Sequence, residues 1–199
     1  MLLNVSALPP DRVGSAIVEM SAELGERGAL FTVDGVRRRP HLTLFMARFP
    51  KATVDAVRSA VAALTSDLDR PRAAHTGFHL TPGHYYEASY RRTGPLMALH
   101  FSVLRALAGM RYSPGEPVVE DYFAPYTEEQ RVNAAESGYD LAGELFRPHV
   151  TITRFPEAPK GPLSESEGDL SFEITRLGLF TADDLGATDR LIAEFVLSP

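Results

Sequence analysis

The sequence predicts an α+β protein in which two pseudo-symmetric lobes of antiparallel sheet carry helices on their outer faces, with a cleft between the lobes. Three observations predict this class. Short, partly alternating apolar runs recur along the chain, and longer segments with helical spacing lie between them. One hexapeptide also occurs twice, as RPHLTL at 39–44 and as RPHVTI at 147–152. Two copies of one strand, each preceded by a helix, indicate two related halves.

The first part of the chain reads as strand, helix and strand pairs. The first apolar run ends at Pro9 and Pro10, where a helix can begin. Asp34 and Gly35 form a strong turn pair inside the next run, and Pro50 stops the first hexapeptide strand. We therefore expect strands at 2–8, 31–36 and 41–49, and helices at 11–27 and 51–68.

The second part adds more strands and two helices. The sequence Thr-Glu-Glu-Gln from 127 is a capping-box signature. The stretch 113–146 separates the hexapeptides widely and is a possible insertion. No linker is long enough to make the halves independent, so 1–199 is expected to be a single bilobal domain. We expect helices at 96–110 and 127–137, and strands at 75–80, 84–91, 147–155, 172–181 and 190–197.

The composition of the chain indicates which kinds of ligand and partner it can bind. The chain has 199 residues, a formal net charge of −6 and no cysteine. An acidic balance disfavours binding along a lengthy duplex and favours a small nucleotide or an RNA terminus. The absence of cysteine excludes disulfides and thiolate metal sites. Neither a signal peptide nor an apolar run long enough to span a bilayer is present, so we expect a cytoplasmic protein with no membrane contact and no obligate protein partner.

Each hexapeptide places a histidine and a threonine on the same face of its strand. Side chains two residues apart on a strand point the same way, so His41 lies beside Thr43 and His149 beside Thr151. The aliphatic residues between them point to the opposite face and can anchor each strand in a core. Two such strands with their polar faces toward one cavity would bring two imidazoles and two hydroxyls together.

This set of groups suits chemistry at phosphorus. Histidine titrates near neutral pH, so one imidazole can accept a proton while the other donates one. The hydroxyls of Thr43 and Thr151 can donate hydrogen bonds to the non-bridging phosphate oxygens as charge develops there. No metal and no cofactor is required. His75, His79 and His84 lack a carboxylate at ligand spacing, so no metal site is expected from them.

The two motifs resemble those of the two-histidine (2H) phosphoesterase superfamily, which includes the RNA 2′,3′-cyclic phosphodiesterases also called 2′-5′ RNA ligases. That superfamily carries two H-x-T-x motifs in two pseudo-symmetric lobes, and HLTL at 41–44 and HVTI at 149–152 match both. The resemblance implies that His41 is the acid toward the leaving oxygen and His149 activates water. The near symmetry of the site leaves this order open, because the ligation direction would exchange the roles.

Strand alternation suggests further substrate-binding residues. Phe45 and Thr153 would continue the faces of the two motifs, where Phe45 could stack on a base or instead pack in the core. The same alternation turns Arg48 and Arg154 away from the site unless a bulge intervenes. Tyr86 and Tyr122 belong to clusters of aromatic residues that could bind a nucleotide, although core or surface positions explain them as well.

The sequence thus predicts a metal-independent phosphoesterase that acts on a ribose 2′,3′-cyclic phosphate. One alternative is a 2′-5′ RNA ligase, or a phosphodiesterase for 2′-5′ or cyclic oligonucleotides. Another alternative, from a different class, is a non-catalytic module that binds a nucleotide or an RNA end with the same side chains.

Overall fold

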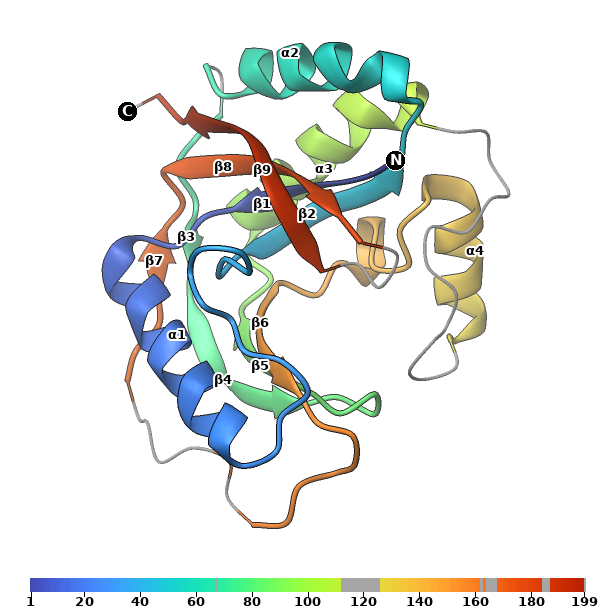
Figure 1. Cartoon of the computed structure of the whole chain (residues 1–199). Coiled ribbons are helices and arrows are strands. Elements are labelled where there is room, and N and C mark those ends of the chain that lie inside the picture. The colour runs from blue at the N-terminus through green and yellow to red at the C-terminus, as the bar shows by residue number, and fades with distance from the viewer. Residues whose placement is uncertain (67, 112–125, 162, 164–167, 184–186, 199) are drawn as a thin grey trace.

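A single seven-stranded antiparallel sheet forms the centre of the molecule. The structure, a computed structural model, describes residues 1–66, 68–111, 126–161, 163, 168–183 and 187–198. The strands of the large sheet follow the order β4-β5-β6-β2-β1-β8-β9, and β3 pairs with β7 in a separate two-stranded sheet (Figure 1). Among the described residues, no helix combines the length and the hydrophobicity that crossing a bilayer requires. The predicted α+β class is confirmed.

Most elements lie where the sequence places them. The helices are α1 (Asp11–Glu26), α2 (Val54–Leu64), α3 (Gly94–Leu107) and α4 (Glu128–Ser137), with 3-10 turns at Lys51–Thr53, Ala108–Met110 and Gly143–Leu145. The strands are β1 (Leu2–Ala7), β2 (Leu42–Arg48), β3 (Arg72–Ala73), β4 (His75–Leu80), β5 (Tyr85–Tyr90), β6 (His149–Arg154), β7 (Phe172–Glu173), β8 (Arg176–Ala182) and β9 (Thr188–Val196).

The two halves of the molecule meet where the motif strands pair. Leu42 of β2 lies opposite Val150 of β6 in an antiparallel arrangement, and both side chains are fully buried. On one side of this junction β2 continues into β1, β8 and β9, and on the other side β6 continues into β5 and β4. The two copies of the hexapeptide therefore lie next to each other in space.

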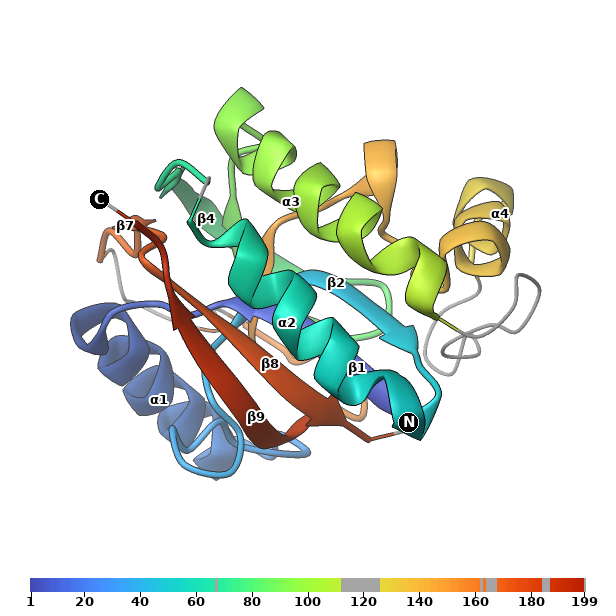
Figure 2. The ribbon, with the colours of Figure 1, turned by 90° about the horizontal axis from the view of Figure 1, so that it is seen from above.

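The helices are exchanged between the halves. Helix α1 follows β1 in the chain but packs against β6, whereas α3 follows β5 but packs against β2. Figures 1 and 2 show α2 and α3 side by side over the β1–β2–β8–β9 half and α1 beside the β4–β5–β6 half. Each helix turns apolar side chains toward its sheet: Val13, Ile17, Met20 and Leu24 from α1, and Leu96, Leu99, Val103 and Leu107 from α3.

Both motif strands carry a β-bulge at the same position of the motif. In the β1–β2 pair, Ser6 lies opposite Thr43 but Val5 lies opposite Phe45, which leaves Leu44 as the extra residue. In the β5–β6 pair the extra residue is Ile152, which is the fourth residue of its motif as Leu44 is of the first. A bulge shifts the alternation of a strand by one residue. The faces predicted from simple alternation therefore hold only up to the threonine.

A side chain from the covering helix holds the carbonyl group of each bulge residue. The Nδ1 atom of His100 in α3 lies 2.6 Å from the Leu44 oxygen, and its Nε2 accepts the Gly143 N–H at 2.8 Å. On the other half, the Ser21 hydroxyl in α1 donates to the Ile152 oxygen at 2.7 Å and accepts the Val33 N–H at 2.8 Å. Each bulge is thereby tied both to a helix and to a loop.

Two of the expected strands differ from the structure. Residues 31–36 are not a strand, because Asp34 Oδ1 accepts the N–H groups of Val36, Arg37 and Arg38 and turns the chain back on itself. The strand expected at 172–181 is divided, because β7 leaves the large sheet to pair with β3. The capping box of α4 is present as predicted. Much of the possible insertion, at 112–125, lies outside the described residues.

We expect replacement of His100 by alanine to destabilise the protein by about 3 kcal/mol, because it leaves the buried Leu44 carbonyl and the partly buried Gly143 N–H without their side-chain partner. The exposed His79 provides the matched control, and His79→Ala should change the free energy of unfolding by less than about 0.5 kcal/mol. Urea denaturation of the two variants measures this difference. Equal stability of the two variants would contradict the role given to His100.

Candidate functional site

Four motif side chains come together on one face of the sheet at the junction of its halves. With Leu42 opposite Val150, an antiparallel register places His41 beside Thr151, and Thr43 beside His149. Leu42 and Val150 point into the core, whereas these four side chains are all partly exposed. The arrangement that the duplicated hexapeptide predicts is therefore compatible with the backbone, and it has a local two-fold pseudo-symmetry.

Both imidazole rings are held in the same way. His41 Nδ1 lies 2.8 Å from the Arg39 carbonyl oxygen, and His149 Nδ1 lies 2.7 Å from the Arg147 carbonyl oxygen. A carbonyl oxygen only accepts hydrogen bonds, so Nδ1 carries the hydrogen in each ring. The Nε2 atoms are then the groups that can exchange a proton with a ligand.

The surroundings of the first threonine leave its own proton available. Asn4 of β1 donates from Nδ2 to the Thr43 hydroxyl oxygen at 3.1 Å, and Ser6 donates to the Asn4 Oδ1. Because the Thr43 oxygen accepts a hydrogen bond within the protein, its O–H can be directed toward a ligand. Asn4 and Ser6 are buried polar residues on the strand next to the first motif.

In the part of the chain that the structure describes, the second histidine has a carboxylate neighbour and the first has none. Glu87 of β5 lies opposite Thr151, and its Oε1 is 3.5 Å from His149 Nε2. The other oxygen of Glu87 accepts a close hydrogen bond from Arg147. Ser6 holds the equivalent position in the first half, because it lies opposite Thr43. The two pseudo-symmetric histidines therefore differ in the charge placed next to them.

The electrostatic environment of His41 favours its neutral form. Burial lowers the pKa of His41, and the nearby charge of His149 acts in the same direction, whereas the hydrogen bond to Arg39 acts against them. His41 is therefore suited to accept a proton near neutral pH. His149 differs from His41 in having a carboxylate 3.5 Å from its Nε2.

The segment after α4 supports the second motif. Gln130 donates to Asp140 Oδ2 at 3.0 Å, and Asn133 donates to the backbone oxygens of Asp140 and Ala142. Burial raises the pKa of Asp140, and interaction with His149 works in the opposite direction. Tyr139 packs edge-on against Phe45 at a centroid distance of 6.4 Å. Part of the stretch predicted as an insertion thus contacts both motif strands.

The bulges overturn two predictions of substrate-binding residues. Phe45 does not share the face of His41 and Thr43, because the bulge at Leu44 turns its side chain into the core beside Phe49, where it is only 1% exposed. Thr153 is fully buried and donates to the Phe31 carbonyl oxygen, because Ile152 shifts the alternation of β6. Neither side chain faces the four motif groups.

The two predicted aromatic substrate-binding residues are Tyr86 and Tyr122, and only Tyr86 lies in a described part of the chain. Tyr86 is 6% exposed and stacks on Phe78 at 5.6 Å, so the expectation that it binds substrate is wrong. Tyr122 lies outside the described residues.

The bulges also place Met46 and Arg154, rather than Phe45 and Thr153, on the same faces of their strands as the motif histidines and threonines. The Asn4 side chain reaches both Thr43 and the Met46 sulfur, which confirms this shift in the first half.

Two residues of the site escaped the sequence-based prediction. Asn4 and Glu87 lie on β1 and β5, the strands that flank the motif strands, and neither belongs to a recognisable motif. Each is a polar side chain that is almost fully buried in its short strand, LLNVSA and YYEASY respectively. A polar residue in a buried strand is the signal that could have identified them.

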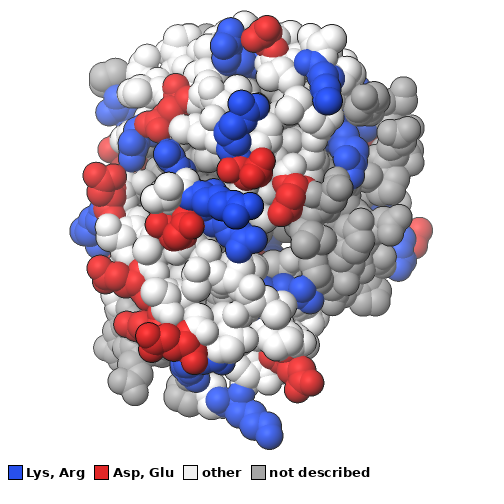
Figure 3. Space-filling view, in the orientation of Figure 1, with Lys and Arg blue, Asp and Glu red and all other residues white. Residues whose placement is uncertain are grey.

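Figure 3 shows no large, purely basic patch among the coloured residues of the face in view. On the face shown in Figure 3, basic side chains alternate with acidic ones. Within the described ranges, no group of three or more histidine, aspartate or glutamate side chains lies close enough together to hold a metal ion.

Comparison with known proteins identifies related sequences and folds. The family model of the 2′-5′ RNA ligase superfamily matches residues 9–185. TT0787 of Thermus thermophilus has a similar structure, with a TM-score of 0.68 and 17% identity over 99% of this chain and 98% of that one. A phosphoesterase (TM-score 0.60, 14% identity) and E. coli LigT complexed with NADP+ (0.62, 11%) each align over 99% of this chain and 98% and 97% of their own. No curated protein matches.

We expect the imidazole of His41 to titrate below the usual histidine value of about 6.5. Replacing His149 with asparagine should raise the pKa of His41, because a nearby positive charge is removed while the burial of His41 is kept. NMR titration of the ring nitrogens measures both effects. An unchanged His41 titration in His149→Asn would mean that the two rings do not interact.

Proposed function

The chain belongs to the 2′-5′ RNA ligase superfamily, and on that premise we propose that it hydrolyses a ribose 2′,3′-cyclic phosphate without a metal ion. Membership makes it an enzyme of phosphoester chemistry. The observation that carries the finer proposal is the pairing of Leu42 with Val150, because it brings to one face of the sheet two imidazoles that are each held through Nδ1, which leaves Nε2 to exchange a proton.

The proposed reaction is a displacement at phosphorus. His41 Nε2 removes a proton from water as the water oxygen forms a bond to phosphorus. The bond from phosphorus to one ribose oxygen breaks, and His149 Nε2 gives its proton to that oxygen. The product is a phosphomonoester beside a free hydroxyl group, and solvent restores the two histidines. General acid and base catalysis of this kind contributes roughly 10² to 10⁴ in rate.

The threonines are proposed to stabilise the charge that develops on phosphorus. Thr43 can donate its O–H to a non-bridging oxygen because Asn4 already donates to its hydroxyl oxygen. Thr151 lies on the same face beside His41 and can serve the other oxygen. Hydrogen-bond donors fixed before the reaction cost little reorganisation during it.

Glu87 is the basis for assigning the acid and the base. Its carboxylate is placed to accept a hydrogen bond from a proton on His149 Nε2, the atom from which a general acid gives its proton, whereas Ser6 offers His41 no carboxylate. This order is the reverse of the one that the family resemblance implies. The ligation direction would exchange the two roles.

Nucleotide complexes of a fold relative also support the proposal. E. coli LigT has been crystallised with NADP+ and with 3′-AMP. For the present chain, a 2′-5′ RNA ligase or a phosphodiesterase for 2′-5′ or cyclic oligonucleotides remains the alternative within the same chemistry. A nucleotide-binding module without turnover is the alternative from another class.

We expect the purified protein to hydrolyse a nucleoside 2′,3′-cyclic phosphate in the presence of a chelator. His41→Ala and His149→Ala should each lower kcat by about 10³-fold, because each removes one proton-transfer group. His79→Ala, at an exposed position on β4, is the control and should retain activity. Turnover that persists in either motif variant would refute the mechanism. Tight binding without turnover in the unmodified protein would favour the binding module.

We expect Glu87→Gln to lower kcat about tenfold, because Nε2 of His149 loses the carboxylate that lies 3.5 Å away. A thermal melt run in parallel detects any general loss of structure from breaking the Glu87–Arg147 pair, in which only Glu87 is buried. An unchanged kcat in a folded Glu87→Gln variant would contradict the role given to Glu87.

A further inference from the structure

The equivalent arginines of the two motifs have different partners. Arg147, two residues before His149, pairs with Glu87. Arg39 holds the same position before His41, but the neighbouring strand offers Ser6 instead of a carboxylate. Among the described residues, no side chain pairs with the guanidinium of Arg39. The first half of the site therefore has an arginine whose positive charge no described carboxylate neutralises.

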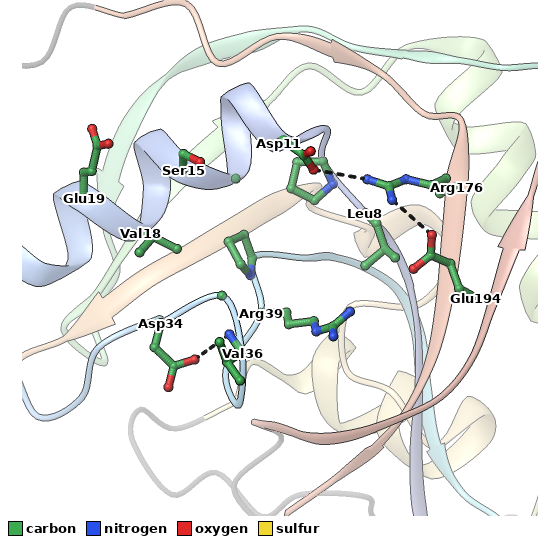
Figure 4. Close-up of a pocket in the computed structure, with 14 residues that line it drawn as sticks. Leu8, Asp11, Ser15, Val18, Glu19, Asp34, Val36, Arg39, Arg176 and Glu194 are labelled. Carbon is green, nitrogen blue, oxygen red and sulfur yellow. Dashed lines mark hydrogen bonds and ion pairs between the residues drawn. The ribbon is translucent and has the colours of Figure 1, made fainter.

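Arg39 lines a pocket of about 450 Å³ next to the first motif (Figure 4). Arg39 and Pro40 lead directly into His41, and the Arg39 carbonyl holds the His41 ring. The volume lies within the range of about 300–1,000 Å³ that small-molecule sites usually have. The apolar part of its wall consists of Leu8, Pro9, Val18, Val36 and Pro40.

The pocket lies on the same face of the sheet as the motif side chains. Ser6 lies opposite Gly178, and Gly178 lies opposite the pocket residue Glu194, so these positions share a face across β1, β8 and β9. A Cβ on Gly178 would overlap the Phe180 ring and approach Leu8 at 3.3 Å. The Phe180 ring is in turn 6.1 Å from the His41 ring. Gly178 and the buried Phe180 therefore lie between His41 and the Leu8 wall of the pocket.

Five other charged residues line the pocket, and among the described residues all of them except the exposed Glu19 have partners. Arg176 pairs with Glu194 at 3.1 Å and with Asp11 at 3.9 Å, and Asp34 accepts three backbone N–H groups. Figure 4 shows the Arg39 side chain extending away from Asp34, toward the side of the pocket where Leu8 and Glu194 lie. An anionic group entering beside His41 would thus meet a cation that is not neutralised by a carboxylate.

We propose that Arg39 and this pocket form a subsite for the nucleotide that adjoins the reacting phosphate. This inference rests on the proposed function. Arg39 binds the 5′ phosphate of the terminal nucleoside, and the pocket receives the sugar and base of the preceding nucleoside against its apolar wall. Arginine suits this task because its guanidinium binds phosphate through two hydrogen bonds. The favoured substrate is then an RNA end rather than a free mononucleotide.

Three substrates separate the parts of this subsite: adenosine 2′,3′-cyclic phosphate, its 5′-phosphorylated form, and the dinucleotide ApA ending in a 2′,3′-cyclic phosphate. We expect kcat/KM to rise in that order. Arg39→Gln should lower kcat/KM about tenfold for the two substrates that carry the second phosphate and by less than about twofold for the first. The neighbouring Arg37→Gln is the matched control, because Arg37 is exposed and does not line the pocket.

Gly14→Leu tests the pocket separately from the arginine. Gly14 lies in α1 and lines the pocket, and no atom lies within 4 Å of the position that a Cβ would take. Leucine also favours a helix more than glycine does, so the variant should fold. Gly14→Leu should lower kcat/KM about fivefold for the dinucleotide only, because the leucine side chain would fill the part of the pocket that the preceding nucleoside occupies in this proposal.

Hydrolysis of all three substrates with equal kcat/KM, or an equal effect of Arg39→Gln on all of them, would overturn the subsite and leave the proposed function intact. If no cyclic phosphate is hydrolysed, the proposed function fails. Binding of ApA 3′-phosphate and of 3′-AMP, measured by calorimetry, then decides about the subsite. If ApA 3′-phosphate binds Arg39→Gln more weakly than it binds the unmodified protein, the subsite is supported. If it binds the variant and the unmodified protein equally well, the subsite is overturned.

Discussion

The pairing of Leu42 with Val150 is the contact on which the site depends. It joins the two halves of the sheet, buries one aliphatic residue from each motif, and thereby turns both histidines and both threonines to the same face. The carbonyl bonds from Nδ1 then fix the ring orientations. The register between the two strands thus determines whether two distant segments of the chain can act on one phosphorus atom.

The sequence correctly predicted which face of its strand each motif histidine and threonine occupies, but not the faces of the residues that follow. One physical reason explains both outcomes. Alternation along a strand follows from backbone geometry, so the shared faces of His41 with Thr43 and of His149 with Thr151 could be read directly. A bulge depends on how a strand meets its neighbour, which no local pattern reveals, and so Phe45 and Thr153 were assigned to the wrong face. Glu87 was missed because its importance comes from the strand pairing alone.

Pseudo-symmetry explains the scaffold, and departures from it explain the chemistry. Each half repeats the bulge, the held carbonyl and the ring orientation, with His100 in one half and Ser21 in the other serving the same purpose. The departures occur at the flanking strands, where Ser6 and Glu87 occupy equivalent positions. A symmetric frame can hold a phosphate between two like groups, but a directional reaction needs those groups to differ in charge.

The exchange of α1 and α3 has a consequence for how the molecule can be divided. The β1–β2–β8–β9 half takes its strands from both ends of the chain and its covering helix α3 from the middle. The β4–β5–β6 half takes its covering helix α1 from near the start of the chain, so no continuous segment contains only one complete half. A fragment cut between the motifs would expose an uncovered aliphatic face of sheet to water. Because the two halves share segments of the chain in this way, unfolding one half also removes the helix or strands that hold the histidine of the other half. We therefore expect both histidines to lose their positions together.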